Sequence, residues 1–151
     1  MRLRNRLGIL IAPRAPWLLQ PFAWGMRSLA LDDSEGYLDM VAETVNGSDR
    51  QVLARPDVRA MFAEDLAEAF AQSSSAFTRD LALISGHWGF ELEAVRSPVR
   101  LWHGTEDRAV PAAAGQAIAA RVPGAQLTLL QGEGHFLVFE RWPEILGWLA
   151  G

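Results

Sequence analysis

An aspartate and a histidine each follow a strand-like run in the last third of the sequence. Asp107 lies in the loop after the run 98–104, and His135 lies in the glycine-containing loop after the run 127–130. Parallel strands end at the same edge of a sheet, so we expect the two side chains to lie close together. A carboxylate that accepts the Nδ1 proton of a histidine fixes the imidazole in one tautomer and stabilises its charged form during acyl transfer. The spacing therefore predicts an acid–base pair.

Each of the two residues also has a purely structural interpretation. Aspartate is favoured in loops because its side chain accepts local backbone N–H groups or caps the helix that follows. A histidine between glycines can occupy a flexible surface turn, although histidine is also the side chain that carries protons near neutral pH. Both interpretations stay open for Asp107 and His135 taken singly, and their joint placement favours the pair.

The elements that must position the pair form one strand–helix–strand unit. Strand-like residues span 98–103 and 126–130, and the stretch 112–121 between them is helical in character. A helix of that length between two strands predicts a right-handed crossover, with the strands parallel and adjacent. A last helix is expected to begin at Trp142-Pro143, since proline is favoured in the first turn.

The first 95 residues predict helices joined by short turns. Residues 14–31 are apolar almost all round, a pattern that needs cover on most sides. A helix capped within 32–34 is expected to end at Asn46-Gly47, because glycine after asparagine is typical of a helix end. Pro56 opens the best amphipathic helix, and helical spacing then continues to residue 85.

Two of these segments together resemble the C-terminal part of the α/β-hydrolase superfamily. They are Ser97–Pro111 and Gly132–Phe136, and the resemblance is specific for about 97–146 and weaker upstream. It implies an α/β class, partial α/β-hydrolase fold, with a helical cap or lid region over 1–95. A parallel βαβ unit and a C-terminal helix would follow over 96–151. By the same resemblance Asp107 matches the acid and His135 the base of a Ser/His/Asp triad.

The serine of such a triad has no counterpart among the 151 residues. A G-x-S-x-G motif does not occur, and Ser85, which precedes Gly86, ends a helix rather than a strand. We therefore expect a truncated, serine esterase-like hydrolase that supplies Asp107 and His135 for ester or amide hydrolysis. The chain alone is expected to be inactive.

The alternative is a non-catalytic binding or interaction protein that retains an α/β-hydrolase remnant. Its helical layer would then be a docking surface for a partner. In the complete enzyme we expect a small apolar ester or amide substrate, because Trp17, Phe22, Trp24 and Met26 could roof an apolar pocket. No cofactor is needed, and the expected protein partner is a second copy of the chain or a complementing N-terminal half.

Composition excludes several other classes of protein. The net charge of −4 disfavours a nucleic-acid partner, and no apolar run is long enough to span a membrane. The absence of cysteine fits a reducing cytoplasm. The three histidines lie at no metal-binding spacing, so no metal site is expected. The basic and then apolar start superficially resembles a signal peptide, but Pro13 and Arg14 interrupt the apolar run.

Overall fold

The computed structural model describes residues 8–151, which divide into two compact units. The first unit covers the described residues up to Glu43 together with Leu53–Glu91, and the second covers Thr44–Val52 together with Leu92–Gly151. Residues 44–52 therefore cluster with the second unit, although helices of the first unit surround them in the sequence. The basic start that resembles a signal peptide lies mostly outside the described residues. Within residues 8–151, no helix combines the length and the apolar character needed to cross a bilayer.

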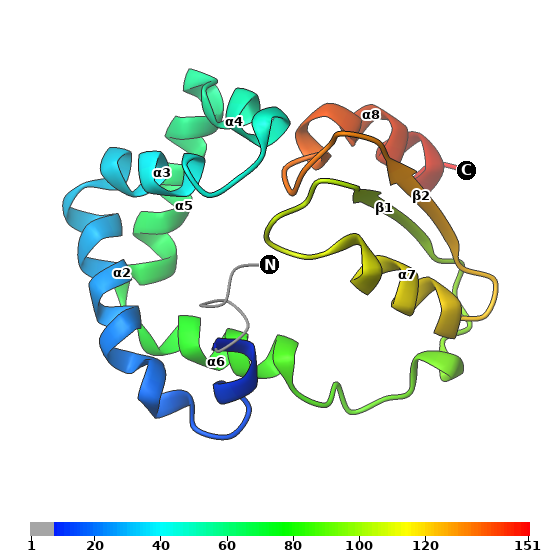
Figure 1. Ribbon diagram of the computed structural model, residues 1–151, viewed down its shortest axis with the longest axis horizontal. Helices are drawn as coiled ribbons and strands as arrows, with labels where there is room; N and C mark the ends of the chain where they lie inside the picture. Colours follow the sequence, from blue (N-terminus) through cyan, green and yellow to red (C-terminus); the bar gives the residue numbers. More distant parts are fainter. Residues whose placement is uncertain (1–7) are drawn as a thin grey trace. The chain divides into compact units, whose positions relative to one another are not determined.

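The first unit is built from helices (Figure 1). The apolar segment forms a short 3₁₀ helix, η1 (Pro16–Leu19), followed by α2 (Gln20–Asp32) with Pro21 in its first turn. Proline is tolerated there because the first N–H groups of a helix have no intrahelical partner. Asp33 then caps α3 (Ser34–Ala42) by accepting the N–H of Gly36 at 2.9 Å.

Helices α5 (Pro56–Ala71) and α6 (Ser75–Ser85) complete the first unit and confirm the two helices predicted there. The apolar residues of α5 are buried near its two ends, at Val58 and Phe70, whereas Met61 is 38% exposed. The Phe70 ring packs on Phe77 of α6 with ring centroids 6.4 Å apart. Aromatic packing therefore joins α5 to α6.

The second unit is built on two parallel strands. They are β1 (Arg100–Gly104) and β2 (Gln126–Leu130), and α7 (Ala112–Arg121) connects them. The register pairs Trp102 with Thr128 and Gly104 with Leu130. The predicted parallel βαβ unit is thus confirmed, and both strands end at the same edge of the sheet.

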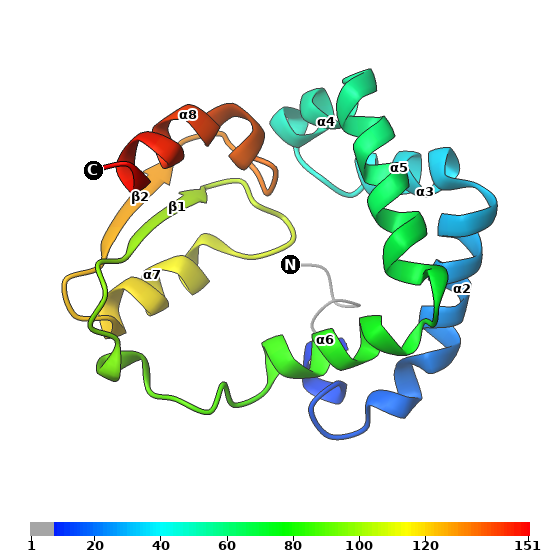
Figure 2. The same cartoon turned by 180° about the vertical axis from the view of Figure 1, so that it is seen from behind.

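Helices α7 and α8 (Val138–Leu149) lie on opposite faces of this sheet (Figures 1 and 2). Successive side chains of a strand point to opposite faces, and two neighbours on β1 show the alternation. The Trp102 ring meets Trp148 of α8 edge-on, with ring centroids 6.0 Å apart. The His103 ring packs on Gly115 of α7, where an added Cβ would lie 2.7 Å from Nδ1.

The structure corrects two expected boundaries. The last helix begins at Val138 rather than at Trp142, because the Leu137 carbonyl accepts the N–H groups of Glu140 and Arg141 and so forms a turn ahead of Pro143. The helix end expected at Asn46-Gly47 is also wrong.

Asn46 instead opens a further helix, α4 (Gly47–Leu53), while α3 has already ended at Ala42. Its Oδ1 accepts the N–H of Asp49 at 2.9 Å, which is the bond of an N-cap residue. Asparagine and glycine are found at both ends of helices, so the dipeptide alone did not decide between a start and a stop.

Candidate active site

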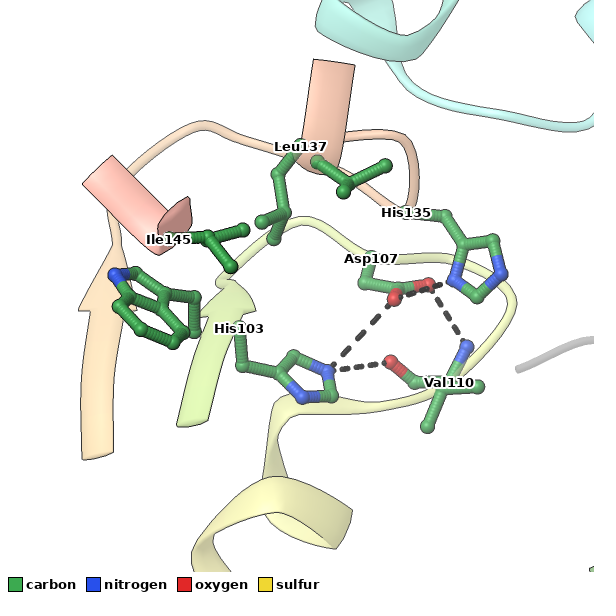
Figure 3. Close-up of a pocket in the computed structure, with 8 residues that line it drawn as sticks. His103, Asp107, Val110, His135, Leu137 and Ile145 are labelled. Atoms are coloured by element: carbon green, nitrogen blue, oxygen red, sulfur yellow. Dashed lines mark hydrogen bonds and ion pairs between the residues drawn. The ribbon is translucent and has the colours of Figure 1, made fainter. Parts of the chain in front are cut away.

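Asp107 lies in the loop between β1 and α7, and its side chain is only 5% exposed. Its Oδ1 accepts the N–H groups of Ala109 and Val110, both at 2.8 Å. Its Oδ2 lies 2.9 Å from Nδ1 of His135, and a carboxylate can only accept, so Nδ1 carries the proton (Figure 3). Asp107 therefore has both roles that the sequence allows. Oδ1 holds the loop, and Oδ2 holds the histidine.

The predicted hydrogen bond between Asp107 and His135 is therefore present in the structure, and it sets the charge state of both groups. Burial alone would raise the pKa of Asp107, but the hydrogen bonds from His135, Val110 and Ala109 outweigh burial and lower that pKa below its usual range. The hydrogen bond to Asp107 raises the pKa of His135, burial opposes it, and the negative charges of Asp107 and Asp49 add to the rise. The pair is most stable as imidazolium and carboxylate.

A second imidazole lies on the other side of the Asp107 carboxylate (Figure 3). Nε2 of His103 is 3.0 Å from the Val110 carbonyl oxygen and 3.8 Å from Oδ2 of Asp107. Because a carbonyl oxygen only accepts, Nε2 of His103 carries the proton. His103 lies on β1 near its end, and it also holds the Asp107 loop through Val110.

The loop that carries His135 is held by residues that the sequence did not point to. The backbone N–H groups of His135 and Phe136 donate to Oδ2 and Oδ1 of Asp49, both at 2.8 Å. The side-chain amide of Asn46 donates to the Gly132 carbonyl at 3.1 Å. Asn46 is 0% and Asp49 is 1% exposed. The pattern of asparagine followed by aspartate three residues later signals a helix start, but nothing in it names the distant loop as a partner.

The two strand-end loops are also joined directly to each other. The N–H of Thr105 donates to the Leu130 carbonyl at 3.0 Å, and the N–H of Glu106 donates to the Glu133 carbonyl at 2.9 Å. Gly104 allows this approach, because a Cβ there would overlap the backbone of Glu133 and Gly134. The loops therefore lie side by side, as parallel neighbouring strands require.

The outer face of His135 is open within the described part of the chain. Its side chain is 44% exposed, and no group among residues 8–151 forms a hydrogen bond with Nε2. An apolar pocket of about 350 Å³ lies beside the pair, lined by Trp102, His103, Asp107, Val110, His135, Leu137, Val138 and Ile145. That lining contains a base and its acid but no serine, threonine or cysteine.

A cluster of metal ligands is absent from the part of the chain that the structure describes. No group of three or more His, Cys, Asp or Glu side chains there is placed to hold a metal ion. His87 lies in the first unit, where its Nδ1 accepts the N–H of Gly89 at 3.0 Å and its Nε2 is 3.6 Å from Glu91.

Solved structures with a similar backbone include three whose alignments cover most of this chain. They are an esterase from Exiguobacterium antarcticum (15% identity, TM-score 0.51), an N-acyl homoserine lactone degrading enzyme (24%, 0.53) and a bromoperoxidase from Bacillus anthracis (23%, 0.54). The chain has a partial α/β-hydrolase fold. The alignments cover 87, 83 and 85% of this chain, in that order, but 47, 50 and 46% of the other three.

The α/β-hydrolase fold confirms the class that residues 97–111 and 132–136 predicted. The chain spans about half the length of the solved structures it matches. No protein-family model and no curated protein sequence matches it. The likeness therefore concerns the fold, and the chemistry of the site depends on its own residues.

Proposed function

We propose that this chain supplies the acid and the base of a Ser/His/Asp triad that hydrolyses an ester or an amide. The observation that carries the proposal is the 2.9 Å contact between Oδ2 of Asp107 and Nδ1 of His135. In such a triad Nε2 of His135 takes the proton of the serine hydroxyl as the oxygen attacks the carbonyl carbon, and then delivers it to the leaving group. Asp107 holds the tautomer and stabilises the imidazolium that forms.

In this proposal the serine comes from outside the 151 residues, because they contain no G-x-S-x-G motif. The sheet leaves edges at which the missing part could pair. Among the described residues β1 pairs with β2 alone, so each strand has an edge without a strand partner. Unpaired N–H and C=O groups along a strand are a template for another strand, from a complementing half or from a second copy.

The substrate in this proposal is a small apolar ester or amide. Most of the pocket beside the pair is lined by apolar side chains, namely Trp102, Val110, Leu137, Val138 and Ile145. A volume of about 350 Å³ lies within the range of small-molecule sites and suits a small acyl group.

The first test assays the chain alone on an activated ester. We expect no burst and no labelling by a serine-directed phosphonate, since a base without a nucleophile gives only about 10²- to 10⁴-fold assistance to water. A burst abolished by the phosphonate would reveal a nucleophile in the chain and contradict the proposal.

The second test restores a serine. A chimera would place the serine-bearing half of the Exiguobacterium antarcticum esterase ahead of this chain. We expect ester hydrolysis that falls by about 10³- to 10⁴-fold in Asp107→Asn and in His135→Gln. Glu106→Gln is the control, because that carboxylate belongs to the same loop and is exposed, whereas the His135 ring is hydrogen-bonded to Asp107. An active chimera that keeps its activity in His135→Gln would contradict the assignment.

A binding protein without catalysis is the second candidate function. The observation that favours it is the exposure of large aromatic side chains in the first unit, with Trp17 at 68% and Trp24 at 63%. The genomic DNA immediately upstream separates the two candidates. An in-frame G-x-S-x-G favours the hydrolase, whereas an unrelated neighbour behind a stop codon favours the binding protein.

A further inference from the structure

We propose that Asp49 is a positioning residue that sets the backbone of the His135 loop and thereby brings Nδ1 of His135 to Asp107. The importance of that alignment for catalysis rests on the proposed function. The alignment itself is a property of this chain and is testable without any enzyme activity.

Asp49 binds two consecutive peptide groups, those of His135 and Phe136, and we call this arrangement the clamp. Oδ2 accepts the N–H of His135 and Oδ1 accepts the N–H of Phe136, both at 2.8 Å. Hydrogen bonds to a charged acceptor are stronger than neutral ones, and the side chain is buried at 1% exposure. A buried carboxylate that lost these donors would be costly to keep, so Asp49 and the loop fix each other.

Asn46 holds the beginning of the same loop. Its Nδ2 donates to the Gly132 carbonyl at 3.1 Å, while its Oδ1 accepts from the N–H of Asp49 at 2.9 Å. Gly134 lies between the two attachment points, and a Cβ there would overlap the Asp49 carboxylate and approach Oδ1 of Asn46. The loop and these two side chains are therefore packed too closely for a side chain at residue 134.

A role in capping α4 does not account for the Asp49 carboxylate. Asn46 is the residue that caps α4, and it does so by accepting the backbone N–H of Asp49. The carboxylate of Asp49 points away from α4 and accepts the backbone N–H groups of the His135 loop. Removing its charge should therefore disturb His135 rather than the helix.

The negative charge of Asp49, like its hydrogen bonds, favours the pairing of His135 with Asp107. The charged and titratable groups around His135 are Asp107 on Nδ1, Asp49 beneath the backbone and His103 beyond Asp107. Glu133, in the same loop, is paired with Arg141. Asp49 thus places negative charge near the imidazole, which supports the protonated form that the reaction would pass through.

The test is Asp49→Asn in the full chain, followed by histidine-selective ¹⁵N NMR and by amide hydrogen exchange. The asparagine oxygen can accept one of the two N–H groups, but its NH₂ group would face the other. We expect a smaller fraction of the Nδ1–H tautomer of His135 and a lower pKa for His135. The His135 and Phe136 amides should exchange roughly ten- to a hundredfold faster.

Asp33→Asn is the matched control, because Asp33 accepts the N–H of Gly36 at the start of α3 in the first unit. It should leave the tautomer and pKa of His135 unchanged. A folded Asp49→Asn protein in which His135 has the same tautomer and the same pKa as in the wild type would overturn the proposal.

If Asp49→Asn fails to fold, amide exchange and proton shifts of the wild-type chain test the proposal instead. Protected amides at His135 and Phe136, whose proton shifts move together as one carboxyl group titrates, would support the clamp. Exchange of both amides at the rate of an unstructured peptide would overturn it. An inactive chimera with these NMR results intact would count against the triad and leave the positioning role standing.

Discussion

The loop that carries Asp107 and the loop that carries His135 are held in place in different ways. The Asp107 loop closes on itself, since Oδ1 accepts N–H groups from Ala109 and Val110, two and three residues further along. The His135 loop is instead attached to Asp49, 86 residues away in the sequence. The Asp107 carboxylate is therefore oriented mainly by bonds within its own loop, which is also bonded to Leu130, Glu133 and Val45. The backbone of His135 is held by a residue far away in the sequence.

This difference predicts which substitutions displace His135 and which displace both His135 and Asp107. A change that loosens residues 44–52 should disturb His135 more than Asp107, because the Asp107 carboxylate keeps its bonds to Ala109 and Val110 even if Arg108 loses Val45. A change at Asp107 should disturb both, because its two oxygens serve the loop and the histidine at once.

Asp107→Ala should have the largest effect. It removes the acceptor of two backbone N–H groups and of His135, from a side chain that is 5% exposed. We expect the free energy of unfolding to fall by about 3 kcal/mol, measured by urea unfolding. Asp107→Asn should cost less, because its oxygen can still accept from Ala109 and Val110. Equal losses in the two variants would show that the local bonds do not hold the loop.

Gly134→Ala tests the remote support of the other loop. The new methyl group would overlap the Asp49 carboxylate, so we expect a loss of about 1–3 kcal/mol in the free energy of unfolding. Gly147→Ala in α8 is the matched control, because its Cβ would have nothing within 4 Å, and it should be neutral or stabilising by about 0.5–1 kcal/mol. Equal stability of the two variants would count against a tight clamp.

The pH dependence of stability should separate the partners of the pair. The pKa of His135 is raised above its ordinary 6.5, so its contribution to stability is complete below that pH and is lost as the pH rises through the raised pKa. The pKa of Asp107 is lowered below its ordinary 3.8, so its contribution is present above that pH and is lost as the pH falls through the lowered pKa.

The difference in unfolding free energy between wild type and His135→Gln should therefore be greatest between about pH 4 and 6.5. Urea unfolding over a series of pH values measures it. A difference that grows from pH 6.5 to 8.5 would have the wrong sign for an imidazolium–carboxylate pair.

Ser48→Ala should have the smallest effect. The Ser48 hydroxyl donates to Oδ1 of Asn46 at 3.0 Å, but Asn46 keeps its bonds to Asp49 and Gly132. We expect a loss of about 0.5–1 kcal/mol in urea unfolding. Ser28→Ala is the control, because it also removes a hydroxyl that donates to a side chain, Asp32, but in an exposed position of the first unit. A loss larger than that of Gly134→Ala would mean that the hydroxyl, rather than the carboxylate, supports the clamp.

The βαβ unit and the pair at its edge could be predicted from the sequence because both depend on local patterns. Strand-like runs, a helix-length connection and turn residues determine where Asp107 and His135 lie along the chain. The parallel register then brings the two loops together. Which oxygen of Asp107 faces His135 was not predictable, because both uses of the side chain are compatible with the same sequence.

The support from Asn46 and Asp49 could not be predicted from the sequence. Asparagine before glycine is compatible with the end or the start of a helix, and the start occurs here. The partners of Asp49 are backbone N–H groups, which leave no trace in the residue types of the loop. Only the tertiary structure brings α4 to that loop.

One measurement tests the acid–base pair most directly. Histidine-selective ¹⁵N NMR of the whole chain, with His135→Gln to assign the signal, reports which ring nitrogen of neutral His135 carries the proton. The 2.9 Å contact predicts a proton on Nδ1, an unprotonated Nε2 and a titration midpoint above 6.5 that falls in Asp107→Asn. A proton on Nε2, or a midpoint that Asp107→Asn leaves unchanged, would contradict the pairing on which the proposed triad depends.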